Sequence, residues 1–337
     1  MEEKRVRIAD IAVELGLSTA TVSNVLHGKT KKISDETVKR VQALLEERQY
    51  VPSMAGILLA QNSSRIIGIM INDHEKYEGR VLEDSYIASS LNDLSAEIEK
   101  SGQFMMIKKT CDVSEIIKFS SMWNMDGVVI MGFCAQDYSY LRERMRIPFV
   151  VLDGYCHDAK RICNISIDNY DGGFQVGEYF KHLGHKRALC IADNCECMDK
   201  ERYEGFRAGF GEDGSAFMLI PSKKELRLAF YAEKLREIRS YSAVFAVSDY
   251  YAAELIQFLR DNQLSVPGEV SVAGFDNAPI SALISPALTT VSQNLSLKAR
   301  TAIEKLRELK EGKDVSAEIV LPVTLIQRSS TGRVKAK

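Results

Sequence analysis

The chain of 337 residues is 45% hydrophobic and 27% charged, and its formal net charge is −2. This composition is typical of a globular protein and excludes a disordered chain, and the length predicts two or three domains. No apolar run approaches the ~20 residues of a membrane helix, and the charged start at residues 1–6 has no apolar segment behind it. We therefore expect a cytoplasmic protein with no membrane partner.

Three helices are predicted in residues 1–50. Apolar residues fall on one helical face of segment 8–15, and Gly16 is the left-handed residue that ends such a helix. Ser18 is a good N-cap for a second helix with its own apolar stripe, and Gly28 ends that helix. Ser34 caps a third. Two short helices joined by a tight turn and followed by a third predict a helix-turn-helix domain.

The outer face of the second helix carries short polar or methyl-bearing side chains: Thr19, Ala20, Ser23, Asn24 and His27. Because this face has few carboxylates, it can approach base edges in the major groove without repelling phosphates. The alternative at this point is a three-helix bundle that contacts another protein.

Five motifs stand in order along this domain: Arg7–Ala12, Gly16–Ser18, Ala20–Leu26, Ile33–Val41 and Tyr50–Pro52. Together they resemble the headpiece of the LacI/GalR family of bacterial transcription regulators. The resemblance implies a repressor that binds a pseudo-palindromic operator as a homodimer. Each headpiece would then place its second helix in one of two successive major grooves.

The resemblance assigns base reading to Thr19, Ala20 and Asn24, and phosphate contacts to Ser18, Thr21 and Ser23. With Arg7, His27 and Ser34 these residues form the expected DNA-contacting set of the headpiece. Asn24 stands where most family members carry arginine. Since asparagine pairs well with adenine and arginine prefers guanine, we expect a shifted base preference at that operator position.

Residues 51–64 are expected to form a hinge. Segment 54–60 is apolar but shorter than the ~12–15 residues that an isolated helix needs. In the family this segment becomes helical only on operator DNA and inserts a leucine into the minor groove. Leu59 matches that leucine, although it could instead pack on the headpiece. Gly56 replaces the usual alanine and disfavours the hinge helix by ~1 kcal/mol.

From residue 65 onward, short apolar runs alternate with amphipathic stretches. The expected buried strands are 66–71, 104–107, 127–131, 148–152, 188–192, 243–247 and 270–273, and the expected helices include 90–100, 171–182, 249–261 and 297–312. This alternation predicts a doubly wound α/β fold. Ligands of such folds bind beyond the carboxyl ends of the strands.

The family resemblance continues through this region. Its landmarks are Asp126–Gly127, Ile147–Pro148, Leu183–His185, Arg202–Phe206, Val266–Asp276, Ser285–Val291 and Leu321–Thr331. They imply a periplasmic-binding-protein-like fold (type I) over residues 65–333, with an effector site and the dimer contacts. We expect one lobe at 65–166 and 292–322 and the other at 167–291 and 323–333.

By the same resemblance, five residues match effector-contacting positions between the lobes: Asp153, Arg202, Ser248, Asp276 and Gln293. Carboxylates and a guanidinium suit hydroxyl-rich ligands, so a sugar or sugar derivative is the first expectation. Ser248 replaces the asparagine of sugar-responding members, and segment 83–86 lacks their Asn-Pro-aromatic element. The alternatives of a nucleobase, another metabolite or no ligand therefore stay open. The sequence also does not say whether the effector releases the DNA or strengthens its binding.

For two of these residues a plainer interpretation exists. Arg202 could form a salt bridge on a helix surface, and Asp276 could be a turn residue that caps the next segment. After Thr331 only six residues follow, with no heptads for a tetramer, so we expect a dimer.

No catalytic or metal site is expected. The seven cysteines lack framework spacing, and the group Cys190, Cys195 and Cys197 lacks a second pair of metal ligands. The run 209–214 matches a dinucleotide fingerprint by letter, but it ends a predicted helix where the motif must open one. Cys156–His157 are adjacent and rarely face one another. We expect no cofactor, and we keep a solute-binding transport protein and an α/β enzyme as rival functions.

Overall fold

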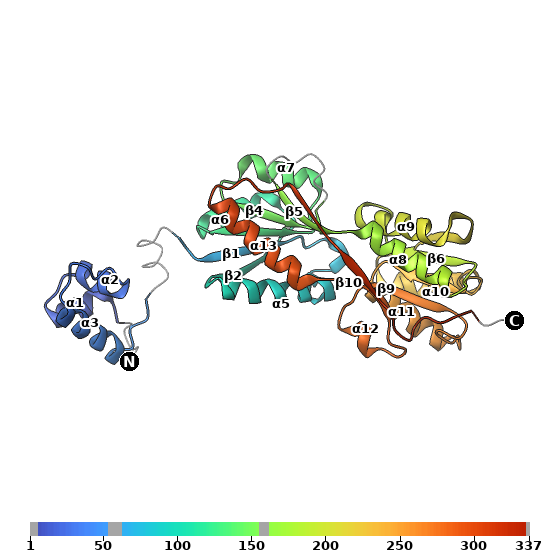
Figure 1. Cartoon of the computed structure of the whole chain (residues 1–337), viewed down its shortest axis with the longest axis horizontal. Coiled ribbons are helices and arrows are strands. Elements are labelled where there is room, and N and C mark those ends of the chain that lie inside the picture. The colour runs from blue at the N-terminus through green and yellow to red at the C-terminus, as the bar shows by residue number, and fades with distance from the viewer. Residues whose placement is uncertain (1–5, 53–62, 155–161, 335–337) are drawn as a thin grey trace. The chain divides into compact units, whose positions relative to one another are not determined.

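The computed structural model describes residues 6–52, 63–154 and 162–334, and it divides into a unit of residues 1–64 and a unit of residues 65–337 (Figure 1). The expected hinge helix with Gly56 and Leu59, and the pair Cys156–His157, lie outside the described residues. No described helix combines the length and the hydropathy that a membrane span requires.

The first unit contains the three predicted helices, α1 (Ile8–Leu15), α2 (Thr19–Leu26) and α3 (Asp35–Glu47). Gly16 adopts φ 67°, which turns the chain sharply between α1 and α2. The predicted apolar faces of the three helices pack together in a small core, which consists of Ile11, Ala12, Val22, Val25, Val41 and Leu44. The helix-turn-helix prediction is therefore confirmed.

The second unit holds two six-stranded sheets, which define lobe 1 and lobe 2 (Figure 1). The lobe 1 sheet has the order β11-β5-β4-β3-β1-β2, and the lobe 2 sheet has the order β12-β10-β9-β8-β6-β7. In lobe 1 the strands are β1 (Ile66–Ile71), β2 (Phe104–Lys109), β3 (Gly127–Met131), β4 (Phe149–Leu152), β5 (Cys163–Ile167) and β11 (Glu318–Leu321). In lobe 2 they are β6 (Ala188–Ala192), β7 (Ser215–Leu219), β8 (Ala243–Ala246), β9 (Ser271–Asp276), β10 (Thr289–Gln293) and β12 (Val323–Ile326). All paired strands are parallel except β10 and β12.

Helices cover both faces of each sheet. The helices are α5 (Ser85–Lys100), α6 (Val113–Met122), α7 (Ala135–Arg144), α8 (Asn169–His182), α9 (Cys197–Phe210), α10 (Lys224–Ile238), α11 (Asp249–Asp261), α12 (Ile280–Leu283) and α13 (Leu295–Lys310). Alternate residues of β1 point to opposite faces: Ile67 and Ile69 pack with α5 and α13, whereas Ile66 and Met70 pack with α6 and α7. In lobe 2, α8 and α9 cover one face and α10 and α11 cover the other. The predicted doubly wound fold is confirmed.

All seven expected strands form, and five further strands were missed: β5, β7, β10, β11 and β12. The missed strands are short and carry polar residues within their apolar runs, which hides the strand pattern. The expectation that segment 104–107 is buried is wrong. It lies in β2 at the edge of the sheet, where Phe104 and Ile107 are exposed. The run 209–214 falls where α9 ends, as predicted.

Candidate functional site

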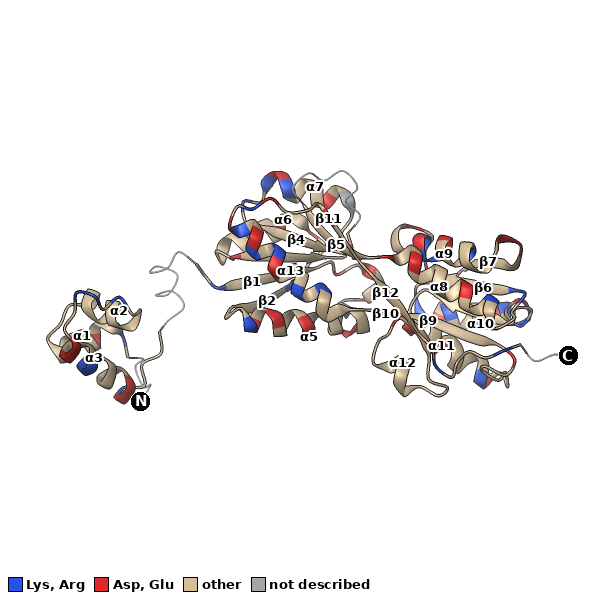
Figure 2. Cartoon of the chain, viewed as in Figure 1, with Lys and Arg blue, Asp and Glu red and all other residues tan. Residues whose placement is uncertain are grey.

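The outward face of α2 is the first candidate site. Val22 and Val25 turn one side of the helix into the core, so Thr19, Ala20 and Asn24 are exposed on the other side. None of the eight residues of α2 is charged (Figure 2). The face therefore offers hydroxyl, amide and methyl groups to a partner without any carboxylate.

The predicted phosphate-contacting residues surround this face. Ser18 caps α2, since its hydroxyl accepts the backbone N–H of Thr21 at 3.1 Å, and Ser34 caps α3 in the same way through Thr37 at 3.3 Å. Arg7 is exposed at the start of α1, where its backbone N–H donates to Asp10. Thr21, Ser23 and His27 are half-buried. The structure also places exposed Lys29, Lys31 and Lys32 directly after α2, a basic run outside the DNA-contacting set predicted from the sequence.

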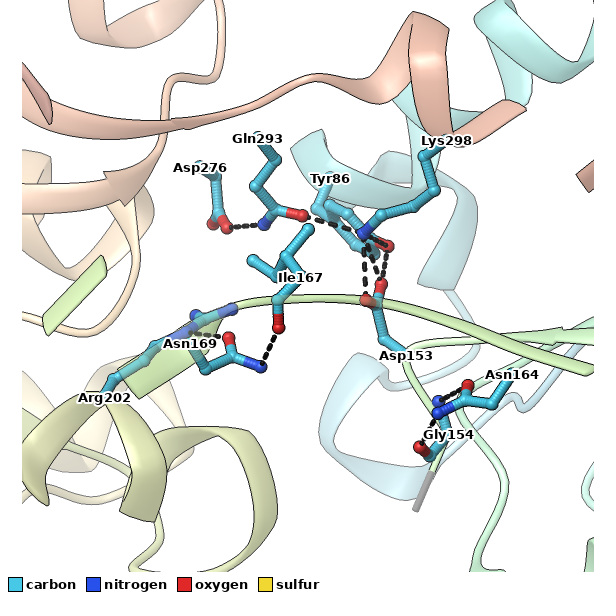
Figure 3. A network of polar contacts seen from close by, with 10 residues as sticks. All are labelled: Tyr86, Asp153, Gly154, Asn164, Ile167, Asn169, Arg202, Asp276, Gln293 and Lys298. Carbon is cyan, nitrogen blue, oxygen red and sulfur yellow. Dashed lines mark hydrogen bonds and ion pairs between the residues drawn. The ribbon is translucent and has the colours of Figure 1, made fainter. Parts of the chain in front are cut away.

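The second candidate site lies where strands of both lobes end (Figure 3). Asp153 follows β4 in lobe 1, while Asp276 and Gln293 are the last residues of β9 and β10 in lobe 2. Because the central strands of each sheet are parallel, their carboxyl ends lie at the same end of the sheet. A chain of polar contacts then joins the three predicted residues through one side chain that was not predicted, Lys298 of α13.

Lys298 is the centre of this chain. Its ammonium lies 2.9 Å from both carboxylate oxygens of Asp153 and 3.0 Å from Oε1 of Gln293. The Tyr86 hydroxyl also donates to Asp153. Gln293 in turn donates from Nε2 to the Asp276 carboxylate at 2.6 Å. The side chains of Lys298 and Asp153 are only 1% and 10% exposed, so this is a buried ion pair.

A sequence signal for Lys298 exists. Lys298, Ala302 and Leu306 stand four residues apart on α13, and all three are buried. A lysine within an apolar helical stripe is rarely buried without a partner, so it predicts a buried carboxylate nearby. The sequence alone does not say that the partner is Asp153, which precedes it by 145 residues.

Arg202 on α9 is buried, so the interpretation as a surface salt bridge is wrong. Its Nε donates to Asn169 at 2.9 Å, its Nη1 donates to the carbonyl of Val247 at 2.7 Å, and the guanidinium lies 3.8 Å from the ring centre of Phe275. Asp199 approaches it only to 4.0 Å. Asn169 is a further residue of this site that was not predicted from the sequence.

The carboxylates of Asp249, at the start of α11, and Asp276, at the end of β9, are close enough for their charges to interact. Asp249 is buried and accepts hydrogen bonds from the Thr290 hydroxyl at 2.5 Å and from the backbone N–H of Ala278 at 2.7 Å. Burial, together with the charge of Asp276, raises the pKa of Asp249 to about 8. Burial also raises the pKa of Asp276, although Arg202 opposes that rise. At neutral pH the pair therefore holds a proton readily.

Ser248 is engaged locally. Its hydroxyl caps α11 by accepting the backbone N–H of Tyr251 at 3.4 Å. Among the described residues, no group of three or more His, Cys, Asp or Glu side chains is placed to hold a metal ion, and six cysteines have free thiols. The groups at these strand ends are hydrogen-bond donors and acceptors suited to binding a polar molecule.

Family models match both units. A model of bacterial regulatory proteins of the lacI family matches residues 7–53, and a model of a periplasmic binding protein-like domain matches residues 178–331. The transcriptional repressor PurR of Aliivibrio fischeri (strain MJ11) is 27% identical over 346 residues, spanning 97% of this chain and 99% of that protein. The transcriptional regulator DegA of Bacillus subtilis (strain 168) is also 27% identical, spanning 96% and 97%.

Solved structures share the fold. The lac repressor dimer bound to operator and the anti-inducer ONPF has a TM-score of 0.84 at 21% identity, covering 98% of this chain and all of that chain. The regulator CelR in complex with cellobiose has a TM-score of 0.68 at 20% identity, covering 97% of this chain. A regulator from Enterococcus faecium with bound ribose has a TM-score of 0.69 at 20% identity over 80% of this chain.

Proposed function

Because the chain belongs to the lacI family of bacterial regulatory proteins, we propose that it represses transcription by binding a pseudo-palindromic operator as a homodimer. A small molecule held between the two lobes controls that binding. The observation that carries the proposal is the exposed, uncharged face of α2 beside a basic run. Neither the binding of a solute nor catalysis in an α/β fold requires such a face.

In this proposal Thr19, Ala20 and Asn24 read bases, while Ser18, Thr21, Ser23 and the lysines after α2 contact phosphates. We assign further DNA contacts, at the edges of the α2 face, to Arg7, His27 and Ser34. Gly56 and Leu59 remain proposed hinge contacts in the minor groove, and they lie outside the described residues.

Exposed apolar side chains support the homodimer. Phe104 on edge strand β2 is 55% exposed, and Leu283 on α12 is 83% exposed. Leu219, Leu226 and Ile280 are further exposed apolar residues of lobe 2. Large apolar side chains left in water on both lobes favour a second copy that covers them.

The proposed effector is a sugar or sugar derivative. Arg202, Asp276 and Ser248 present a guanidinium, a carboxylate and a hydroxyl, which together can bind several hydroxyl groups. Gln293 adds an amide whose nitrogen and oxygen already contact Asp276 and Lys298. Asp153 contributes less than the sequence suggests, because Lys298 and Tyr86 already occupy both of its oxygens. The relatives named PurR make a purine the main competitor.

Selection of duplexes from a random pool tests the DNA proposal. The purified full chain should enrich a pseudo-palindrome and bind it less tightly as salt increases, because phosphate contacts release counterions. Enrichment of no common sequence, or binding that salt does not change, would refute the operator proposal. A thermal-shift screen of sugars and purines then identifies the effector class. A ligand at 100 times its Kd should stabilise the chain by ~2.7 kcal/mol.

A further inference from the structure

Lobe 1 contains a pocket near the starts of its strands, at the opposite end of the sheet from Asp153. It has a volume of about 580 Å³, within the ~300–1,000 Å³ range of small-molecule sites. Ile67, Ile303 and Leu306 form its apolar part, and the ends of α5 and α13 form its walls. It opens at the starts of β1 and β3, whereas Asp153 and Gln293 stand where strands end.

The charges of this pocket are not balanced. Its two lysines are paired within the protein, Lys100 with Glu97 at 2.7 Å and Lys310 with Asp126 at 2.8 Å. Three guanidinium groups also line it, those of Arg65, Arg300 and Arg307, and none has a carboxylate within ion-pair distance in the described part of the chain.

One lining carboxylate, Glu304, lies between the two arginines of α13. Even if Glu304 turned to one guanidinium, the other two would still have no carboxylate within ion-pair distance. Guanidinium groups bind phosphate oxygens through two parallel hydrogen bonds, which makes phosphate a better fit than a neutral ligand.

Arg65 gives the pocket a direct link to the linker before lobe 1. It follows Ser64, the last residue of the first unit, and its backbone adopts φ 56°, a left-handed conformation that costs a non-glycine residue energy. Its guanidinium donates to the carbonyl of Gly102 at 2.5 Å, which helps to hold that conformation. Because Arg65 itself joins the linker to β1, a ligand that contacts Arg65 would act on the backbone at this junction.

We propose that this pocket binds a small phosphorylated molecule, with the phosphate on Arg65, Arg300 and Arg307 and the carbon skeleton on Ile303 and Leu306. Helix α13 connects it to the proposed effector site, since Lys298 on the buried face of α13 pairs with Asp153 while Arg300 and Arg307 line the pocket. In this proposal the chain carries two separate small-molecule sites, one near the carboxyl ends and the other near the amino ends of the lobe 1 strands.

Calorimetric titration of the full chain with glycerol 3-phosphate tests this proposal, with glycerol as the neutral comparison and constant ionic strength. Glycerol 3-phosphate should bind and glycerol should not. Arg300→Gln with Arg307→Gln should weaken binding by about 10-fold or more, because the loss of even one charge-assisted hydrogen bond to a phosphate weakens binding by about that factor. Binding should also slow hydrogen exchange of the β1 amides. The matched control is Arg146→Gln with Arg236→Gln, two exposed arginines away from the pocket, which should bind as the wild type does.

Arg202→Gln distinguishes binding in this pocket from binding at the proposed effector site. It should leave glycerol 3-phosphate binding unchanged, and loss of binding in that variant alone would place the ligand at the effector site and overturn the proposal. Equal affinity in all variants, or no binding to the wild type, would also overturn it. The titration contains no DNA, so its failure is distinguishable from a failure of the operator proposal.

Discussion

The face of α2 and the network around Lys298 are both polar, but they are built in opposite ways. The α2 face keeps uncharged side chains in water, and all of them come from one short helix. The network buries opposite charges and joins residues as far apart as Tyr86 and Lys298, which are separated by 212 positions. Changes on the α2 face should therefore alter DNA binding with little effect on folding, whereas changes in the network should first alter stability.

The largest expected effect is that of Lys298→Met. It leaves Asp153 buried without its cation, and breaking a buried ion pair in this way costs about 3–5 kcal/mol of unfolding free energy. Urea unfolding of the full chain measures the loss. Asp153→Asn combined with Lys298→Met should recover most of it, because no uncompensated charge remains. A single variant within ~0.5 kcal/mol of the wild type would show that the pair does not form.

Stability should also depend on pH through Asp249. Because its pKa in the folded chain is raised to about 8, above the ~3.8 of an unfolded aspartate, the folded state holds a proton that the unfolded state releases. The stabilisation is complete below pH ~4 and is lost as pH rises towards 8, by at most ~1.4 kcal/mol per pH unit. Asp249→Asn should flatten this slope in unfolding curves measured from pH 4 to 8. An unchanged slope would contradict the raised pKa.

Ser18→Ala gives a smaller effect at the border of the α2 face. Loss of the helix cap should cost about 1 kcal/mol of headpiece stability. Circular dichroism of the full chain, recorded through the thermal transition of the headpiece (residues 1–50), measures this loss of stability. Thr19→Ala is the matched control, because Thr19 is exposed beside the cap and should change stability by less than ~0.5 kcal/mol. Equal losses in the two variants would show that Ser18 does not act as a cap.

The smallest effect on stability is expected from Asn24→Arg, on an exposed position of α2. Its melting temperature should match that of the wild type, while duplex selection should shift one operator position from adenine to guanine. An unchanged selected sequence would remove Asn24 from the base-reading set.

The two regions also differ in how far the sequence predicts them. The α2 face follows from helical periodicity within eight residues, so its caps, core and exposed positions were predictable. Arg202, Asp276 and Gln293 were placed by family resemblance, but Lys298 and Asn169 were missed because their partners are set by long-range packing. The unpaired arginines of the lobe 1 pocket were missed for the same reason. Arg65 and Arg300 are 235 positions apart, and only the fold brings them to one cavity.

The most direct test of DNA reading by α2 is a salt series of shift assays on the selected duplex and on a random duplex, with the wild type and Thr19→Ala/Asn24→Ala. Both proteins should lose affinity steeply as salt increases, because their phosphate contacts are intact. The double variant should bind the selected duplex at least ~10-fold more weakly and the random duplex about as well as the wild type does, since each base contact contributes ~1–3 kcal/mol of discrimination. Equal affinity of the two proteins for the selected duplex would contradict base reading by α2.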